Sequence, residues 1–399
     1  MLKKSADVVV IGGGIIGCSI AYNLAKKGSK VIVVEKRERV CAGASGANSG
    51  AVPLSLFGPP ESPIIPLVKE SVNRYGGLSE EIDYDIECQK AGLLTCALDE
   101  KQYQAVKKHA EGLWKNGIKV RMLDGDEIQK LEPALSKSIV GGSEDEESYL
   151  LNPFKVTYGY ARAAKKLGAE ILLSTETQKI EVEKGKVTAL VTDKGKIGTE
   201  FVVDSAGPWS GEIGKMVGLT IPIEPIKGQV IITEPVAINR RWRYIMDADY
   251  LSPHTGHQET TGLRTKLGVI GGFIQENTGN WIVGSSHEPT YDKAATVQTL
   301  VLMARRAIEF MPMLKHVNCI RTFAGIRPRC YVDDLPILGK VASLSGFIIA
   351  TGHLGAGVTL APITGKLISE LIIENKTSLP IDAFAFSRFE NTESNQLKG

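Results

Sequence analysis

The stretch that decides the fold is Asp7-Val8-Val9-Val10-Ile11-Gly12-Gly13-Gly14-Ile15-Ile16-Gly17, close to the amino terminus. Its β-branched run is typical of a buried parallel strand, and it passes directly into the pattern GxGxxG. Apolar residues then recur at every fourth position and predict a helix, at Ile16, Ile20 and Leu24. A second β-branched run, Val31–Val34, predicts the next strand, and Glu35 follows it. A strand, a glycine turn, a helix, a strand and an acid in this order predict a dinucleotide-binding βαβ unit.

The glycines of this turn have separate mechanical roles. Gly12 makes the tight turn, Gly14 lets the backbone approach a pyrophosphate, and Gly17 lets the helix pack on the strand. The helix amino terminus offers free N–H groups and the positive end of its dipole to phosphate, and Glu35 can accept hydrogen bonds from ribose hydroxyls. We therefore predict that the unit contacts a dinucleotide through Gly12, Gly14, Ile15, Ile16, Gly17, Glu35 and Lys36.

A loop of small residues, Cys41–Gly50, follows the second strand in place of another regular βα unit. Small side chains let the backbone pack against a large flat group, and their amides and hydroxyls can bond to phosphate or ring edges. The alternative is a flexible surface loop, which the same composition also allows. On the first interpretation the loop adds cofactor contacts from Ala44, Ser45, Ser49, Gly50 and Ala51.

The composition indicates a folded enzyme of two domains. The chain has 399 residues, of which 43% are hydrophobic and 23% charged, so a disordered, fibrous or polytopic membrane protein is excluded. The 47 basic and 45 acidic residues nearly balance, and no basic block offers a surface to nucleic acid. The six cysteines include no CxxC and no Cys/His ligand spacing, which predicts a reduced compartment and no metal site.

The amino terminus also permits a competing interpretation as a signal peptide. Lys3 and Lys4 precede the apolar run, and Ile15-Ile16-Gly17-Cys18 resembles a lipoprotein cleavage box. Three consecutive glycines weaken a signal helix, and the chain continues after Cys18 as the second half of the βαβ unit, so we favour the folded interpretation. No run reaches the roughly 18 apolar residues of a membrane-spanning helix. We expect a cytoplasmic protein, either free or peripheral at the inner face of the membrane.

The order of motifs along the chain resembles that of one enzyme family. The later motifs are Phe201–Trp209, Gly325–Pro328, Thr351–His353 and Leu360–Pro362. With the βαβ unit and the small-residue loop, they resemble the FAD-dependent D-amino-acid-oxidase superfamily, in the lineage of glycine oxidase, sarcosine oxidase and the β subunits of proline or hydroxyproline dehydrogenases. The resemblance extends from the amino terminus to near residue 375, and the order of motifs is more specific than any one of them.

This resemblance implies non-covalent FAD and a further set of cofactor contacts. Thr177 matches a position that contacts adenine through its backbone, although the family usually has an aliphatic residue there. The helix that follows residues 355–357 would aim its amino terminus at the N1–C2=O edge of the isoalloxazine and stabilise the charge that arrives with a hydride. Cys330 lies near the position where monomeric sarcosine oxidases attach flavin covalently, but its spacing to the following aspartates differs. The implied contacts are Thr177, Gly207, Trp209, His353, Leu354, Gly355, Ala356, Gly357, Val358 and Thr359.

The resemblance also places a substrate arginine at Arg327, where glycine oxidases hold the substrate carboxylate. A planar guanidinium suits a carboxylate better than a lysine does, and Arg329 is the alternative two residues along. The competing structural role for Arg327 is a surface ion pair with Asp333 or Asp334, because most arginines are exposed.

The predicted substrate pocket departs from that of glycine oxidases at three places. Gly355 stands in place of a second arginine, His287 in place of a methionine, and Phe273 or Gln275 falls near a tyrosine position. His287 could orient an amine or bond to substrate, or it could simply end a strand beside Glu288. We assign catalytic roles to Arg327 and His287, and substrate contacts to Arg327, Phe273, Gln275, His287 and Gly355.

The predicted fold is α/β (α+β overall), with a Rossmann-type FAD-binding domain interleaved with a mainly antiparallel β-sheet substrate domain. We expect the first domain at 1–85, 146–222 and 318–399, and the second at 86–145 and 223–317. Two local expectations accompany this division. The acidic run Glu144–Glu147 predicts a solvated bend, and Pro362 is tolerated in the carboxyl-terminal helix because it falls in the first turn.

The resemblance implies oxidation of the C–N bond of a small amino or imino acid, of glycine, sarcosine, proline or hydroxyproline type, by hydride transfer to flavin N5. Electrons would pass to oxygen, a quinone or a partner subunit, in a homo- or hetero-oligomer. Two alternatives stay open. The chain could be a flavin-carrying β subunit that is inert alone, or a 2-hydroxy-acid or glycerol-phosphate dehydrogenase on the same scaffold.

Overall fold

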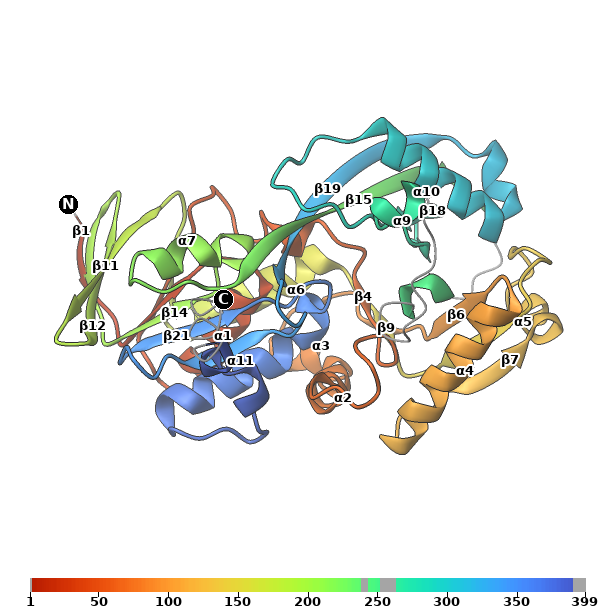
Figure 1. Cartoon of the computed structure of the whole chain (residues 1–399). Helices are drawn as coiled ribbons and strands as arrows, with labels where there is room; N and C mark the ends of the chain where they lie inside the picture. Colours follow the sequence, from red (N-terminus) through yellow and green to blue (C-terminus); the bar gives the residue numbers. More distant parts are fainter. Residues whose placement is uncertain (1, 238–242, 252–262, 390–399) are drawn as a thin grey trace, which may run out of the picture.

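The computed structural model describes residues 2–237, 243–251 and 263–389. One lobe contains a six-stranded sheet in which the first five strands are parallel and the last is antiparallel (Figure 1). Its strand order is β10 (Glu170–Leu172), β3 (Val31–Val34), β2 (Val8–Ile11), β14 (Phe201–Asp204), β21 (Phe347–Thr351) and β20 (Ile337–Lys340). The helix α1 (Ile15–Lys26) joins β2 to β3, so the predicted βαβ unit is present.

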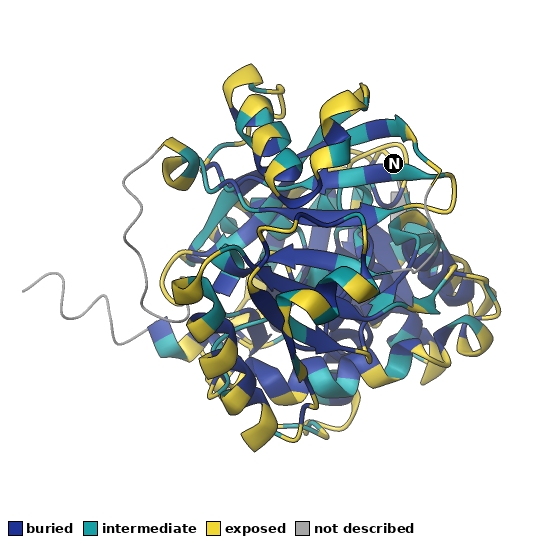
Figure 2. Ribbon diagram, turned by 90° about the vertical axis from the view of Figure 1, so that its right-hand side faces the viewer, coloured by how far each residue is buried: buried dark blue, intermediate teal, exposed yellow. Residues whose placement is uncertain are grey.

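The residues of β2 and β3 are buried throughout because the sheet is covered on both faces. Val8 and Val10 pack into a core that includes residues of the helices α1, α6 (Pro153–Lys166) and α11 (Gly357–Ile373). Val9 and Ile11 point the other way, toward a four-stranded sheet of β1 (Leu2–Ser5), β13 (Gly195–Gly198), β12 (Lys186–Thr192) and β11 (Thr177–Glu183). A strand buried on both faces needs apolar residues at every position, which is the pattern that the sequence has. Figure 2 shows this interior as a dark core beneath helices with exposed outer faces.

The other lobe is built on an eight-stranded sheet, antiparallel except where β16 pairs with β6. Its order is β19 (Cys319–Cys330), β15 (Ile223–Pro235), β18 (Asn280–Gly284), β17 (Gly272–Gln275), β16 (Tyr244–Asp247), β6 (Leu93–Ala97), β8 (Gly141–Asp145) and β7 (Arg121–Asp124). The strands β17 and β18 are antiparallel neighbours joined by a short hairpin turn. The helices α10 (Val297–Phe310) and α4 (Glu100–Lys115) bury apolar faces in this lobe.

Smaller elements connect the lobes and complete the fold. The strands β4 (Ala51–Val52), β9 (Tyr149–Leu150) and β5 (Gln89–Lys90) form a three-stranded sheet. Within the described residues, the remaining α-helices are α2 (Ile64–Tyr75), α3 (Leu78–Glu81), α5 (Gly125–Leu131), α7 (Ser210–Lys215) and α9 (Leu263–Lys266). Within the described residues, no helix is long and apolar enough to cross a membrane.

Two long strands carry the chain between the lobes. β15 and β19 pair antiparallel from Ile223↔Cys330 to Thr233↔Cys319, and Figure 1 shows them running from the first lobe into the second. We expected the whole of 318–399 in the cofactor domain, but β19 is a strand of the eight-stranded sheet. Its carboxyl-terminal half still meets the first lobe, because the Leu354 N–H donates to the Pro328 carbonyl at 2.8 Å.

The expected solvated bend at 144–147 is wrong at its first two residues. Glu144 and Asp145 end β8 and are 2% and 1% exposed. Arg121 and Arg243 both pair with Glu144, and Asp145 accepts hydrogen bonds from Ser55 and Ser148. A carboxylate can be buried when cations and donors compensate its charge, and the partners here come from distant parts of the chain.

Pro362 lies beyond the first turn of α11, which corrects the second local expectation, because the helix begins at Gly357. A proline has no N–H for the carbonyl four residues earlier, here that of Val358. The hydroxyl of Tyr75, at the end of α2, donates to this carbonyl at 2.5 Å. The Ser71 hydroxyl accepts from the Ile363 N–H at 3.3 Å. Side chains of α2 therefore replace the hydrogen bonds that the proline removes.

We expect Tyr75→Phe to destabilise the protein by about 1–3 kcal/mol, because a buried carbonyl loses its donor. The measurement is thermal unfolding at a fixed excess of FAD. Tyr331→Phe is the matched control, since Tyr331 is 52% exposed and should change stability by no more than about 0.5 kcal/mol. Equal stability of the two variants would show that the Tyr75 hydroxyl does not support α11.

Candidate cofactor and substrate site

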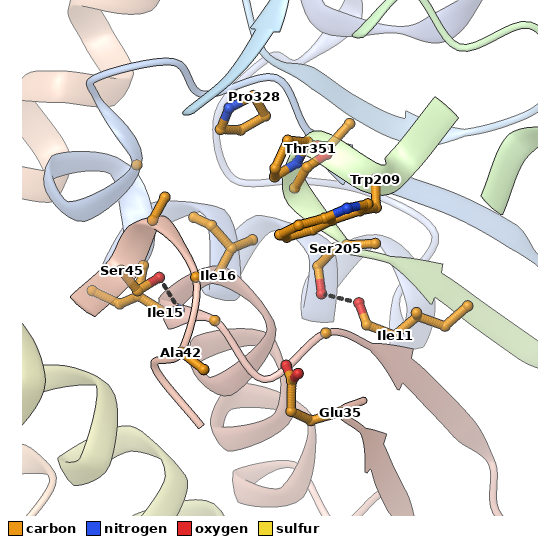
Figure 3. A pocket seen from close by; sticks show the side chains of 18 of the residues that line it. Ile11, Ile15, Ile16, Glu35, Ala42, Ser45, Ser205, Trp209, Pro328 and Thr351 are labelled. Carbon is orange, nitrogen blue, oxygen red and sulfur yellow. Dashed lines mark hydrogen bonds between the residues drawn. The ribbon is translucent and has the colours of Figure 1, made fainter. Parts of the chain in front are cut away.

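A cleft lies at the carboxyl ends of the parallel strands, between β2 and β14. The chain leaves β2 toward β3 on one side, while β14 lies on the other, so this is a topological switch point. Ligands bind at such points in open α/β sheets. Figure 3 shows Glu35 at one end of the cleft, Pro328 and Thr351 toward the other, and Trp209 between them.

The turn before α1 has the geometry of a phosphate cradle. Gly12 has φ +106°, and a Cβ there would lie 2.6 Å from the Ser205 carbonyl oxygen. A Cβ at Gly17 would lie 2.0 Å from the Gly12 carbonyl oxygen, so both positions require glycine for packing. A Cβ at Gly14 would meet only the Ser45 hydroxyl, at 3.2 Å. Gly14 therefore keeps space open in front of the helix amino terminus.

Glu35 and Ser45 are fixed on either side of this turn. The Glu35 carboxylate accepts hydrogen bonds from the Gly13 N–H at 2.7 Å and from the Arg37 N–H at 2.8 Å. The Ser45 hydroxyl accepts from the Ile15 N–H at 2.9 Å and so caps α1 (Figure 3). The small-residue loop thus packs on the helix terminus and is not a detached surface loop.

Most of the predicted cofactor contacts line the cleft. Gly17, Ser49, Gly50, Ala51, Ala356 and Thr359 are not among the described residues that line it. Gly50 has φ +73° and a Cβ there would lie 2.0 Å from the Leu151 carbonyl oxygen, so its role is backbone packing. Sequence reasoning missed several neighbours that do line the cleft, all of them beside predicted positions: Ala42, Ala47, Asn48, Thr175, Glu176, Ser205 and Pro208.

Asp204 anchors the segment 205–209 from below the cleft. It is fully buried at the end of β14, and one carboxyl oxygen accepts from the Ala206 N–H and the Ser210 hydroxyl, both at 3.0 Å. The other oxygen has no hydrogen-bond partner in the described part of the chain. Burial raises the pKa of Asp204 to about 7.

A raised folded-state pKa means that the contribution of Asp204 to stability is present at low pH and is lost as the pH rises toward 7. Between pH 5 and pH 8, the free energy of unfolding of the wild type should fall by about 2 kcal/mol more than that of Asp204→Asn, whose amide does not titrate. Thermal unfolding across this range measures the difference, with the exposed Asp382→Asn as control. A constant gap between wild type and Asp204→Asn at all pH values would contradict the assignment.

The carboxyl-terminal motif forms the wall of the cleft at the start of α11. His353, Leu354, Gly355, Gly357 and Val358 line it. The ring of His353 is buried, lies 3.2 Å from the Thr364 hydroxyl, and has its pKa lowered to about 3 by burial. His353 is therefore neutral at physiological pH and packs the loop. The dipole of the 17-residue α11 has its positive end at the cleft.

Arg327 of β19 lines the same cleft. Its guanidinium donates to the Ser286 carbonyl at 3.2 Å, the His287 ring at 3.1 Å and the Ser285 hydroxyl at 2.5 Å. In the described ranges no Asp or Glu forms an ion pair with it, and burial lowers its pKa. Arg329 instead pairs with Asp334 and Glu224. The surface ion pair weighed for Arg327 therefore belongs to its neighbour.

Among the described residues, the hydrogen bonds of Arg327 use three of its five guanidinium hydrogens. Both bonds to Ser286 and His287 use Nη1, and the bond to Ser285 uses Nη2. The Nε–H and the second Nη2–H have no partner among the described residues. A guanidinium Nε–H and an Nη2–H on the same side of the group can bind a carboxylate through two hydrogen bonds. The face of the group rests on Gly228, where a Cβ would lie 2.4 Å from Nη2.

Three of the predicted substrate residues lie elsewhere. Phe273 is fully buried and packs against Phe310 of α10, and the Gln275 amide donates to the Val236 and Gly279 carbonyls at the hairpin. Neither lines the cleft, because the register of β17 turns Phe273 into the lobe core. His287 contacts Arg327 but is likewise not among the described residues that line the cleft.

Sequence reasoning missed two tyrosines of the second lobe. Tyr244 begins β16 and Tyr250 lies in the 3-10 helix at Ala248–Leu251. The Tyr250 hydroxyl is 3.9 Å from where a Cβ of Gly355 would stand, at the wall of the cleft, and the Tyr244 hydroxyl is 3.1 Å from where a Cβ of Gly272 would stand. Burial raises the pKa of both phenols, so they are neutral donors. No local signal identifies them, because β16 is placed by pairing with the distant strand β6.

Cys330 lies in a buried core cluster with Ile221 and Ile337. Burial raises the pKa of its thiol to about 11, which leaves it uncharged and unreactive at neutral pH. In the described ranges, no group of three or more His, Cys, Asp or Glu side chains could hold a metal ion.

A model of the FAD-dependent oxidoreductase family matches residues 7–371. The chain belongs to this family. Three relatives span nearly its whole length. Hydrogen cyanide synthase subunit HcnC of Pseudomonas aeruginosa is 27% identical over 435 residues, covering 98% of this chain and 97% of the relative. Glycine oxidase of Geobacillus kaustophilus is 27% identical over 395 residues, covering 96% and 97%. The crystal structure of L-proline dehydrogenase from P. horikoshii matches with a TM-score of 0.85 and 30% identity, covering 98% and 99%.

This FAD-dependent oxidoreductase has a cleft that fits its cofactor. The open space at Gly14 and the amino terminus of α1 suit a pyrophosphate, and the carboxylate of Glu35 suits ribose hydroxyls. Apolar side chains in the lining of the cleft would suit flat rings, among them Ile16, Val34, Ile213, Met216 and Val358. The resemblance found in the sequence is thereby confirmed.

Gly14→Val should abolish FAD retention while leaving the fold intact. Its Cβ meets only Ser45 in the protein, so the added side chain occupies the space that a pyrophosphate needs. Flavin absorbance per protein after gel filtration measures retention. Gly77→Val is the control, because a Cβ there meets nothing within 4 Å. Full FAD content in the Gly14 variant would mean that the phosphate site lies elsewhere.

Proposed function

We propose that this FAD-dependent oxidoreductase oxidises the C–N bond of a small amino or imino acid, of glycine, sarcosine, proline or hydroxyproline type. The observation that carries the proposal is Arg327, a half-buried guanidinium that lines the cleft, has no carboxylate partner in the described ranges and keeps unused hydrogens on Nε and Nη2. A partly desolvated charge without an anion is costly, and a substrate carboxylate would compensate it. The relatives named glycine oxidase and L-proline dehydrogenase support the same substrate class.

The titratable groups near Arg327 favour a substrate that binds as a neutral amine. Burial lowers the pKa of His287 and of His353 to about 3, which makes both weak bases. Tyr244 and Tyr250 keep their protons because burial raises their pKa values. The amine would therefore lose its proton before it enters, and the residues of the site would orient it. FAD, when bound, supplies the ring that accepts the hydride.

The chain's own residues would contribute orientation and charge. Arg327 would hold the carboxylate, Tyr250 would donate to it or to the amine, and the start of α11 would place positive partial charge at the far wall. FAD would be held without a covalent bond, consistent with a buried Cys330. Released electrons would pass to oxygen, a quinone or a partner subunit, in a cytoplasmic or membrane-peripheral homo- or hetero-oligomer.

A second candidate role is that of a flavin-carrying subunit with no turnover alone. The relative named hydrogen cyanide synthase subunit HcnC favours it. The mass of the complex purified from its native host would separate the two roles. A substrate panel of proline, sarcosine, glycine and 2-hydroxyglutarate, run with a dye acceptor beside oxygen consumption, would separate amine from alcohol oxidation.

Arg327→Ala should lower kcat/KM for the best amino acid by roughly 10- to 150-fold, because a charge-assisted bond of about 1.5–3 kcal/mol is lost. FAD content should stay near that of wild type, and Arg327→Lys should recover only part of the activity, since a point charge replaces a two-point clamp. The measurement is steady-state turnover with the amino acid and with its decarboxylated amine.

The decarboxylated amine is the internal control. It should be a poor substrate for wild type and should lose little in Arg327→Ala. If acid and amine lose activity equally, the arginine is structural and the amino-acid proposal loses its main support.

A further inference from the structure

His287 has contacts on both sides that suggest a role apart from substrate contact. Its Nε2 lies 3.1 Å from Arg327 Nη1, and its Nδ1 lies 3.4 Å from the Gly268 carbonyl oxygen. A guanidinium can only donate, so Nε2 must accept and the ring proton must be on Nδ1. The ring is a neutral bridge from the Gly268 turn to the arginine.

The turn at Gly268 holds the ring firmly. The His287 N–H donates to the Leu267 carbonyl at 3.0 Å. Gly268 has φ +56°, and a Cβ there would lie 2.6 Å from the His287 Cβ. Leu267 and Gly268 directly follow α9, whose Arg264 pairs with Asp249 at 2.7 Å, next to Tyr250. One short element therefore supports both His287 and the turn that carries Tyr250.

The neighbouring strand end is fixed as well. The Ser286 hydroxyl donates to Glu288 at 2.7 Å and accepts from the Gln229 N–H at 3.1 Å. Glu288 is in turn paired with the buried Lys227 at 3.1 Å. The Ser286 carbonyl and the His287 ring thus offer Nη1 two rigid acceptors. Rotation of the guanidinium would break both contacts.

We propose that His287 is a positioning residue that fixes the guanidinium of Arg327 with its Nε–Nη2 edge toward the cleft. The inference rests on the proposed function, in which that edge binds the substrate carboxylate. It replaces the catalytic and substrate-contact roles first predicted for His287. A residue that acts in this way affects carboxylate binding without exchanging a proton during the reaction.

Two substitutions test the contacts of the two ring nitrogens of His287 separately. A glutamine side chain can place an acceptor near the position of Nε2, whereas an asparagine reaches only as far as Nδ1. His287→Asn should keep the Gly268 contact but leave Arg327 Nη1 without this acceptor. We expect His287→Asn to lower kcat/KM for the amino acid by roughly 5- to 20-fold, mainly through KM, with little change for the decarboxylated amine. His287→Gln should stay within about threefold of wild type.

Gly228→Ala adds a Cβ against the face of the Arg327 guanidinium that rests on Gly228, and it does not alter the His287 side chain. Its new Cβ would displace the guanidinium, so it should produce the same acid-selective loss as His287→Asn. This variant keeps the test decisive if an altered His287 impairs folding. FAD content and thermal unfolding are recorded for every holoenzyme, and both should match wild type.

The pH profile of kcat/KM distinguishes positioning from catalysis. A positioning role predicts the same profile shape in wild type, His287→Asn and His287→Gln. Loss of one ionisation in both variants, or equal loss of activity with acid and amine, would overturn the proposal. The proposal would also be overturned if kcat/KM were unchanged in His287→Asn while Arg327→Ala showed an acid-selective loss. In that case the proposed function would survive. No acid-selective loss in Arg327→Ala itself would overturn both.

Discussion

Removing even part of a charged guanidinium from water costs free energy unless an anion or a set of oriented acceptors compensates it, and the half-buried Arg327 sets this constraint on the site. Ser285, Ser286 and His287 supply neutral acceptors on one side of the group, which orient it without neutralising its charge. Gly228 supplies the flat surface beneath it. The hydrogens that remain on Nε and Nη2 are thus available to a carboxylate that enters the cleft. The phenols of Tyr244 and Tyr250 keep their protons, because burial raises their pKa values, and so carry no charge opposite to that of Arg327.

The two-lobe architecture brings this arginine to the cofactor. β19 belongs to the eight-stranded sheet, yet its carboxyl-terminal half contacts the loop that precedes α11, so Arg327 extends from one lobe into the cleft of the other. The long pairing with β15 gives the strand a rigid partner over this whole distance. On the cofactor side, α11 presents its amino terminus to the same cleft although Pro362 interrupts its hydrogen bonds, because Tyr75 and Ser71 of α2 replace them. The site therefore depends on contacts between elements that are remote in the sequence.

The cofactor half could be predicted from the sequence because its determinants are local. Gly12, Gly17 and Glu35 act within one βαβ unit, and their spacing specifies their geometry. The substrate half was predicted less well, because strand pairing decides which side chains meet. Phe273 faces the lobe core because alternate side chains of a strand point to opposite faces of the sheet. The position of Tyr244 depends on the parallel pairing of β16 with β6. His287 was identified as a residue of interest, but its partner lies 40 positions away and only the structure shows that it is Arg327. Glu144 was misjudged for the same reason, since its two arginines are distant in sequence.

Binding of an unreactive ligand tests the central claim without turnover. Furan-2-carboxylate and furan-2-carboxamide have nearly the same shape, and only the first carries a negative charge. Difference spectroscopy of the flavin band in the purified holoenzyme gives a Kd for each. An Arg327 edge that receives a carboxylate predicts that the acid binds at least about tenfold more tightly than the amide, in keeping with one charge-assisted bond. It also predicts that this preference disappears in Arg327→Ala at unchanged FAD content. Equal affinities for the two ligands in the wild-type enzyme would contradict the account.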